Sequence, residues 1–235
     1  MMKPVSLGQY SHVVFFTGAG MSAESGVPTY RGSGGIWAQY RWEEYACQEA
    51  FDADPHKVLD FHQQRRGRVL ACQPHAGHTH LAALQAAHPG LSIITQNTDG
   101  MHQRAGARGV IELHGSLWRL RCARHGAVED LVAGAYAQRH CGVCGAMLRP
   151  DITWFADAVN AAVFAQAERL IAQAQLFVAV GTSGIVYPAA GLVPAAAHGG
   201  ARMIEVNPEE TELSRLFAEC VRQPAGAALP ALFAV

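Results

Sequence analysis

The chain has 235 residues and a formal net charge of −1; 16% of its residues are charged and 50% are hydrophobic. This length suits one large domain or a core domain with a smaller insertion, and the near-neutral charge excludes a global field that recruits nucleic acid or an anionic membrane. No apolar run reaches the roughly 18 residues that span a bilayer, and the N-terminus lacks the apolar core of a signal peptide, so we expect a cytoplasmic protein.

The first predicted element is a buried strand followed by a glycine-rich turn. Residues 12–16 are mostly apolar, and GAGMSA at residues 18–23 fits the dinucleotide fingerprint G-x-G-x-x-A. Its glycines would let backbone N–H groups approach a pyrophosphate, whose charge the following helix N-terminus favours. Pro28 and the glycines around it end that helix early, so the fingerprint leads into a loop. Tyr30 and Arg31 in this loop suggest a lid over the cofactor.

Further apolar runs predict strands, and helical patterns fall between several of them. The strands are expected at residues 92–95, 110–113, 176–180 and 202–206, and the helices at 75–87, 161–174 and 189–198. Strands that alternate with helices indicate a parallel sheet covered by helices on both faces. The predicted fold is therefore α/β, with a Rossmann-like, doubly wound parallel sheet.

Two segments break this alternation. Residues 35–74 contain polar and helical patterns without a convincing strand, and residues 119–150 contain a cysteine cluster, two glycine turns and a hairpin-like pattern. We interpret them as insertions that pack together as a small domain, a helical module plus a zinc ribbon. The Rossmann-like domain would then comprise residues 1–34, 75–118 and 151–235.

The cysteine cluster has the spacing of a metal site. Cys122 and His125 form one pair, and Cys141 and Cys144 form a second pair after fifteen intervening residues. Three thiolates and one imidazole at this spacing resemble a zinc ribbon, whose zinc would be structural because four protein ligands leave no open position. Two alternatives remain: His140 as the fourth ligand, although it adjoins Cys141 and would strain the chelate, and a degenerate site without metal.

Polar side chains follow several of the predicted strands. Gln96, Asn97 and Asp99 come after the strand at 92–95, where ligands of open α/β sheets bind, and they could hydrogen-bond a carboxamide such as that of nicotinamide. The alternative is an ordinary Asx turn.

A histidine follows the next predicted strand. We expect His114 to lie exposed at the same edge of the sheet, where it could act as a general base, although it is one of 12 histidines. Residues 181–183 and Asn207 follow the last two predicted strands and suit phosphate and ribose contacts, with ordinary turn chemistry as the alternative.

These motifs, in this order, resemble the sirtuins, a family of NAD-dependent protein lysine deacylases. The family pattern GAGxSxxSGIPxFR is GAGMSAESGVPTYR at residues 18–31, and TQNIDxLHxxAG is TQNTDGMHQRAG at residues 95–106. The HG element lies at residues 114–115, the zinc module at 122–144 and the GTS loop at 181–183. Five motifs at compatible spacing extend this resemblance over nearly the whole chain.

The resemblance implies NAD as co-substrate and one structural zinc ion. The residues implied to line the NAD site are Gly18, Ala19, Gly20, Ser22, Tyr30, Arg31, Gln96, Asn97, Asp99, Gly181, Thr182, Ser183 and Asn207. Asn97 and Asp99 would hold the nicotinamide carboxamide while the acyl oxygen attacks C1′ of the ribose and an alkylimidate forms. His114 would then deprotonate the ribose hydroxyls, and the products would be nicotinamide, deacylated lysine and 2′-O-acyl-ADP-ribose. Tyr30 would replace the family phenylalanine that shields C1′ from water.

Two segments resemble those that clasp a substrate peptide as an added β-strand. They are ITWF at residues 152–155 and GIVY at residues 184–187, which implies peptide contacts for Trp154, Phe155 and Val186. The family's Phe-Gly-Glu is here Phe-Ala-Asp at residues 155–157, so the chain departs from the family pattern in this loop.

The choice of acyl group depends on residues 62–65. Sirtuins that remove succinyl or malonyl groups carry Tyr-x-x-Arg where this chain has His62-x-x-Arg65. Arg65 could bind a carboxylate bidentately, and His62 could donate one hydrogen bond, more strongly if protonated. We expect some activity on acidic acyl groups beside deacetylation. The alternative is a solvated basic face, because Arg66 and Arg68 are close in sequence.

Parts of the sequence are shared with three other classes of protein. A protein mono-ADP-ribosyltransferase is the nearest alternative, because it cleaves the same cofactor with a different acceptor. The proline in the fingerprint loop argues against a dehydrogenase, and residues 126–138 contain Glu129 and Asp130 but no lysine or arginine, which argues against a nucleic-acid-binding zinc ribbon. We expect acylated lysine in proteins or peptides as the partner, no nucleic-acid or membrane partner, and a monomer.

Overall fold

The computed structural model describes residues 4–30, 35–131 and 135–235. Its larger sheet has six parallel strands in the order β3-β2-β1-β7-β8-β9. These strands are β1 (Val13–Thr17), β2 (Leu91–Thr95), β3 (Ile111–Glu112), β7 (Leu176–Val180), β8 (Arg202–Val206) and β9 (Glu219–Val221). The parallel sheet confirms the predicted fold class.

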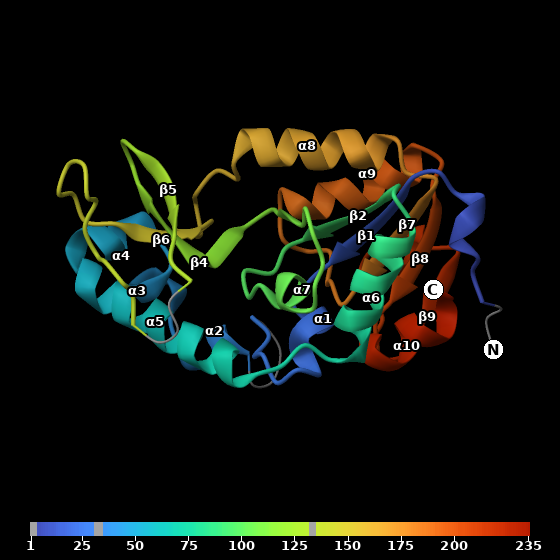
Figure 1. The fold of residues 1–235 in the computed structure, drawn as a ribbon, viewed down its shortest axis with the longest axis horizontal. Coiled ribbons are helices and arrows are strands. Elements are labelled where there is room, and N and C mark those ends of the chain that lie inside the picture. The colour runs from blue at the N-terminus through green and yellow to red at the C-terminus, as the bar shows by residue number, and fades with distance from the viewer. Residues whose placement is uncertain (1–3, 31–34, 132–134) are drawn as a thin grey trace.

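Helices cover both faces of this sheet (Figure 1). In the view of Figure 1, α8 (Ala161–Ala172) and α9 (Leu192–His198) lie above it, and α6 (Ala76–Ala87) and α10 (Ala225–Leu232) lie below it. Successive strand residues point to opposite faces of the sheet. Val13 and Phe15 therefore belong to the core between the sheet and the helices α6 and α10. Val14 and Phe16 belong to the core between the sheet and the helices α8 and α9. Burial on both faces explains why the first four residues of β1 are all apolar.

The smaller sheet lies at the other end of the molecule (Figure 1). Its strands β4 (Gly115–Cys122), β5 (Gly126–Glu129) and β6 (Arg149–Ile152) are antiparallel in the order β5-β4-β6. The helices α2 (Ile36–Gln39), α3 (Trp42–Tyr45), α4 (Gln48–Ala53) and α5 (Pro55–Ala71) lie beside it. A third apolar core joins α5 to β4 and β6, so the two predicted insertions pack together.

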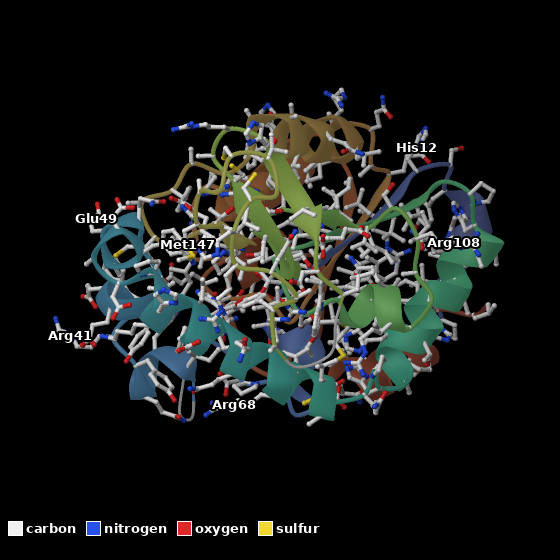
Figure 2. All side chains as sticks on the ribbon, turned by 60° about the vertical axis from the view of Figure 1, so that its left-hand side comes forward. His12, Arg41, Glu49, Arg68, Arg108 and Met147 are labelled. Carbon is white, nitrogen blue, oxygen red and sulfur yellow. The ribbon has the colours of Figure 1, made fainter. Side chains whose placement is uncertain are left out.

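Two of the predicted domain boundaries fall inside strands: the boundary at residues 118/119 lies in β4, and the boundary at residues 150/151 lies in β6. That division stays a prediction. Figure 2 shows side chains filling the space between the small sheet and its helices, with charged groups such as Arg41, Arg68 and Arg108 at the surface.

The remaining short elements are η1 (Leu7–Gln9), α1 (Gly20–Ala23), α7 (Met101–Arg104), η2 (Ala189–Gly191) and η3 (Ser214–Leu216). The helix predicted at 189–198 is divided into η2 and α9. Pro194 explains the position of α9, because proline lacks an N–H and is tolerated in the first turn of a helix. The three-residue strand β9 escaped prediction because it is short and none of its residues is fully buried. Among the described residues, no helix has both the length and the apolar character to cross a membrane.

Candidate active site

A cleft of about 600 Å³ lies at the carboxyl ends of the parallel strands, beside the small sheet and its helices. It brings together most of the predicted site residues: Gly18, Ala19, Gly20, Tyr30, His62, Arg65, Gln96, Asn97, His114, Trp154, Phe155, Gly181, Thr182, Ser183, Val186 and Asn207. Asp99 lines a smaller cavity that shares Ala19, Tyr30, Arg65 and Asn97 with the cleft. Ser22 is buried behind these residues, and Arg31 lies outside the described residues.

The turn after β1 interlocks with the loop after β7. A Cβ added at Gly18 would lie 2.8 Å from the Gly181 carbonyl oxygen, and one added at Gly20 would lie 2.7 Å from the Gly181 Cα. The amide of Gly20 donates to the Gly181 oxygen at 2.8 Å. The helix α1 ends at Ala23, which confirms that the fingerprint leads into a loop. These glycines are therefore required by the close approach of two loops, a reason that the sequence did not reveal.

Asn97 and Asp99 are held rigidly after β2. The side-chain amide of Asn97 donates to the Gly18 oxygen at 2.9 Å and to the Ser22 hydroxyl at 3.3 Å. The Asp99 carboxylate accepts from the Met101 amide at 2.9 Å, so the predicted Asx turn exists while Asp99 also faces the smaller cavity. Burial raises the pKa of Asp99 above its usual value.

A buried histidine lies within hydrogen-bond distance of the Ser22 hydroxyl. The Nε2 atom of His78, on α6, lies 3.3 Å from the Ser22 hydroxyl, and burial lowers the pKa of His78 to about 2. His78 lies outside the motifs that predicted the site. Its place one turn before Leu81, on the buried face of α6, was the available signal.

His114 is partly buried rather than exposed as predicted. Its Nδ1 atom lies 2.9 Å from the Gln96 carbonyl oxygen, to which it donates, so the lone pair is on Nε2. Burial lowers the pKa of His114 below its usual value. The imidazole is therefore neutral at neutral pH and can accept a proton.

The loops after β2, β7 and β8 are tied to one another through Thr182. The side-chain amide of Gln96 donates to the Thr182 hydroxyl at 2.8 Å, and that of Asn207 donates to the Thr182 carbonyl oxygen at 3.3 Å. The predicted cofactor residues on these loops thus form one continuous wall of the cleft.

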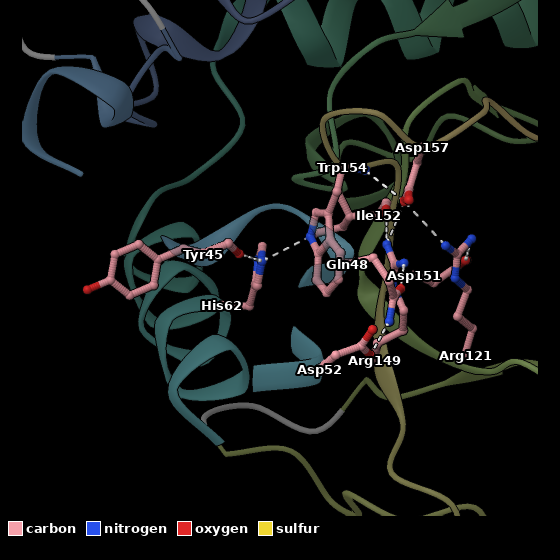
Figure 3. A network of polar contacts seen from close by, with 10 residues as sticks. All are labelled: Tyr45, Gln48, Asp52, His62, Arg121, Arg149, Asp151, Ile152, Trp154 and Asp157. Atoms are coloured by element: carbon pink, nitrogen blue, oxygen red, sulfur yellow. Dashed lines mark hydrogen bonds and ion pairs between the residues drawn. The ribbon is translucent and has the colours of Figure 1, made fainter. Parts of the chain in front are cut away.

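The His62 ring is enclosed by protein groups (Figure 3). Its Nε2 atom lies 3.2 Å from both the Tyr45 carbonyl oxygen and the Trp154 indole nitrogen, and its Nδ1 atom lies 3.4 Å from a guanidinium nitrogen of Arg65. Burial, followed by the charge of Arg65, lowers the pKa of His62 well below its usual value. His62 is therefore neutral, and the stronger hydrogen bond of a protonated ring is not expected.

Arg149 contacts the segment that follows β6 and holds it in place (Figure 3). No sequence motif pointed to this residue. Its guanidinium donates to the Asp157 carboxylate at 2.6 Å and lies 3.5 Å from the centre of a Trp154 ring. The same carboxylate accepts from the Trp154 amide at 3.1 Å. Ala156 has a φ of +67°, in the left-handed region, where the family pattern has glycine. Asp157 thus holds its own loop in place.

The predicted zinc ligands converge. The ligand atoms of Cys122, His125, Cys141 and Cys144 all lie within 4.8 Å of one another. The Nδ1 atom of His125 lies 3.6 Å from the Cys122 sulfur and 3.4 Å from the Cys141 sulfur, and the Cys122 and Cys144 sulfurs are 3.7 Å apart. A tetrahedral zinc ion requires separations of roughly 3.4–3.8 Å between such ligands, so the four residues fit zinc.

Two further observations favour this ligand set. Hydrogen bonds from the backbone N–H groups of Cys144 and Val143 lower the pKa of Cys141 to about 6, which favours the metal-binding thiolate. The rival ligand His140 is exposed and lies outside the cluster, where its backbone pairs with that of Met147.

Comparisons with known proteins agree with this geometry. A sequence profile described as "Sir2 family" matches residues 18–188. The chain is 44% identical over 227 residues to an "NAD-dependent protein deacylase" of Ralstonia nicotianae, with 94% of this chain and 91% of the relative covered.

Two solved structures are each 38% identical to the chain. A Sir2 homolog–NAD complex has a TM-score of 0.88, with 96% of this chain and 89% of that chain covered. A mutant Sir2 homologue in complex with 2′-O-acetyl ADP ribose has a TM-score of 0.87, with 96% and 92% covered.

Proposed function

Because the chain belongs to the Sir2 family, we propose that it is an NAD-dependent protein lysine deacylase. The observation that carries this proposal is the position of Asn97, Asp99 and His114 after neighbouring parallel strands, around the cleft and its adjoining cavity. Ligands of open α/β sheets bind at this edge. The relatives described above support it, since one is a deacylase and two hold NAD or an acetylated ADP-ribose.

NAD supplies the glycosidic bond that breaks and the ribose that accepts the acyl group. The acyl oxygen of the lysine would attack C1′ while the electron pair of that bond leaves with nicotinamide. The acyl group then passes to the ribose, and one water molecule is consumed when the lysine amine is released. The expected products are nicotinamide, deacylated lysine and 2′-O-acyl-ADP-ribose.

The interlocked loops would bind the cofactor. Residues 18–20 and 181–183, with Gln96 and Asn207, would contact its phosphates and riboses, because they form the wall of the cleft. Asn97 and Asp99 would hold the nicotinamide carboxamide, with Ser22 orienting the Asn97 side chain. The role of Arg31 rests on the family resemblance alone.

His114 would act as the general base. Its Nδ1–H group is fixed by the Gln96 carbonyl, so Nε2 accepts the proton of a ribose hydroxyl as that oxygen attacks the acyl carbon. Tyr30 would shield the reacting ribose from water. The segment containing Trp154 and Phe155 and the loop containing Val186 would hold the acylated peptide as an added strand between them.

The pH dependence tests the assignment of His114. Because burial lowers the pKa of His114, the loss of activity on acidification should have its midpoint below pH 6.5. Initial-rate measurements of kcat/KM from pH 5 to 8 would show this limb. A midpoint at or above 6.5 would contradict the neutral, partly buried base.

The zinc module would hold one structural ion. We expect His125→Ala to weaken zinc binding by more than about 100-fold, because even the loss of an outer-shell partner of a metal ligand costs 10–100-fold. Metal analysis after dialysis against a chelator measures this loss, together with the accompanying fall in Tm. His140→Ala is the matched control and should retain one zinc per chain; equal losses in both variants would refute the ligand set.

A direct assay tests the proposed function. The protein is incubated with an acetyl-lysine peptide with and without NAD, and the mass of the peptide is measured. We expect the loss of one acetyl group only in the presence of NAD. An intact peptide together with ADP-ribose attached to the protein or peptide would instead indicate the ADP-ribosyltransferase alternative.

A further inference from the structure

We propose that the Tyr30 hydroxyl and the Arg65 guanidinium together bind the free carboxylate of an acidic acyl group, such as succinyl- or malonyl-lysine. This inference rests on the proposed function and names the pair of residues that would select the substrate. Tyr30 stands where the family pattern has phenylalanine, and it comes from a different segment of the chain than Arg65.

The two side chains are already joined. Arg65 donates from Nη2 to the Tyr30 hydroxyl oxygen at 2.9 Å, and its guanidinium lies 5.3 Å from the centre of the Tyr30 ring. The same hydroxyl lies 3.2 Å from the Thr98 hydroxyl. Because its oxygen accepts from Arg65, its proton is directed to another acceptor, which a substrate carboxylate can become.

The positive charge of Arg65 is in no ion pair with a carboxylate in the part of the chain that the structure describes. Arg66, Arg119 and Arg149 each lie within 3.0 Å of a carboxylate oxygen. Arg65 has no such partner among the described residues, and the residues outside them include no aspartate or glutamate. The charge of Arg65 lowers the pKa of Asp99 and so offsets part of the rise caused by burial, but Arg65 and Asp99 form no ion pair. A partly buried cation of this kind favours an anionic ligand.

Of the two residues in the Tyr-x-x-Arg pattern of sirtuins that remove acidic acyl groups, only the arginine is present in this chain. The tyrosine is replaced by His62, which is fully buried and neutral and whose ring nitrogens contact Tyr45, Trp154 and Arg65. Tyr30 supplies a phenol to the same arginine from the loop that follows α1. Tyr30 and Arg65 both line the cleft that contains His114, so an acyl group held there is in the reaction cavity.

Tyr30→Phe tests the proposal, because it removes the hydroxyl and keeps the ring. The kcat/KM values for a succinyl-lysine peptide and an acetyl-lysine peptide are measured at saturating NAD, and their ratio is compared with that of the unmodified protein. We expect the ratio to fall about tenfold, as for the loss of one hydrogen bond to a charged group. Using a ratio cancels any effect of Tyr30 that is common to both substrates.

Matched comparisons separate the effect of the carboxylate on this ratio from the effect of the size of the acyl group. A succinamoyl-lysine peptide, in which a neutral amide replaces the carboxylate, should lose this dependence on Tyr30. Tyr40→Phe, which removes a hydroxyl from the wall of the adjoining cavity, should leave the ratio unchanged. In an Arg65→Met background, where the ratio is already low, Tyr30→Phe should have little further effect.

The outcomes distinguish this inference from the proposed function. If Tyr30→Phe leaves the ratio unchanged, or raises it because the hydroxyl competes with the substrate for Arg65, the inference is overturned. It is also overturned if the unmodified protein removes acetyl but not succinyl groups. If no acyl-lysine peptide is deacylated in the presence of NAD, the proposed function itself fails.

Discussion

Replacing His114 by alanine should lower kcat for deacylation by about 10²–10⁴, the usual contribution of a positioned general base. The reason is geometric: the Gln96 carbonyl fixes Nδ1, which leaves Nε2 of a neutral ring as the proton acceptor. Steady-state rates with an acetyl-lysine peptide and saturating NAD measure the effect. His198→Ala, which removes an exposed histidine from α9, is the control and should retain full activity.

The same variant separates the two halves of the reaction. If His114 acts only on the ribose hydroxyl, breakage of the nicotinamide bond precedes its step. We therefore expect His114→Ala to exchange labelled nicotinamide into NAD, in the presence of the acetylated peptide, while deacylation is lost. Equal loss of exchange and deacylation would move His114 to the first step, and unchanged deacylation would remove it from the mechanism.

The largest effect on stability is expected for Asp130→Ala. Its carboxylate lies 3.0 Å from a guanidinium nitrogen of Arg66, and the side chains of this pair are 2% and 0% exposed. Because the variant removes the carboxylate that faces a fully buried guanidinium, the free energy of unfolding should fall by about 3–5 kcal/mol. For a chain of this size, that corresponds to a fall in Tm of roughly 6–20 °C, measurable by thermal denaturation.

A second ion pair provides the matched control. Asp60 and Arg139 approach to 2.6 Å, but the Asp60 side chain is 56% exposed, so Asp60→Ala should cost at most about 1 kcal/mol. Equal effects of the two variants would show that burial of the Arg66–Asp130 pair does not matter. The guanidinium of Arg66 also lies over the rings of Trp118 and Tyr136, and the Trp118 indole donates to the Asp99 carbonyl oxygen. Loss of the pair should therefore also loosen the loop that contains Asp99.

The features that the sequence predicted well are local or periodic. Apolar runs located β1, β2, β7 and β8, and because parallel strands end at one edge of a sheet, the residues that follow them could be expected to meet. The zinc ligands were equally accessible to prediction, since each of the two pairs has the short spacing of metal ligands and their ligand atoms lie close together.

The features that the sequence could not predict join distant segments. His62 and Trp154 are 92 residues apart, Arg66 and Asp130 are 64 apart, and Tyr30 and Arg65 are 35 apart. The helical face that His62 shares with Arg65 suggested an accessible pair. Only the packing of α5 against the segment after β6 shows that His62 is enclosed and Arg65 is not.

The central claim is that cleavage of NAD is coupled to transfer of the acyl group from lysine to ADP-ribose. Mass spectrometry of a single reaction, with NAD and an acetyl-lysine peptide, measures all three products together. The account predicts equal amounts of nicotinamide, deacetylated peptide and acetyl-ADP-ribose. Nicotinamide release with an intact acetylated peptide, or deacetylation that yields free acetate without consuming NAD, would contradict it.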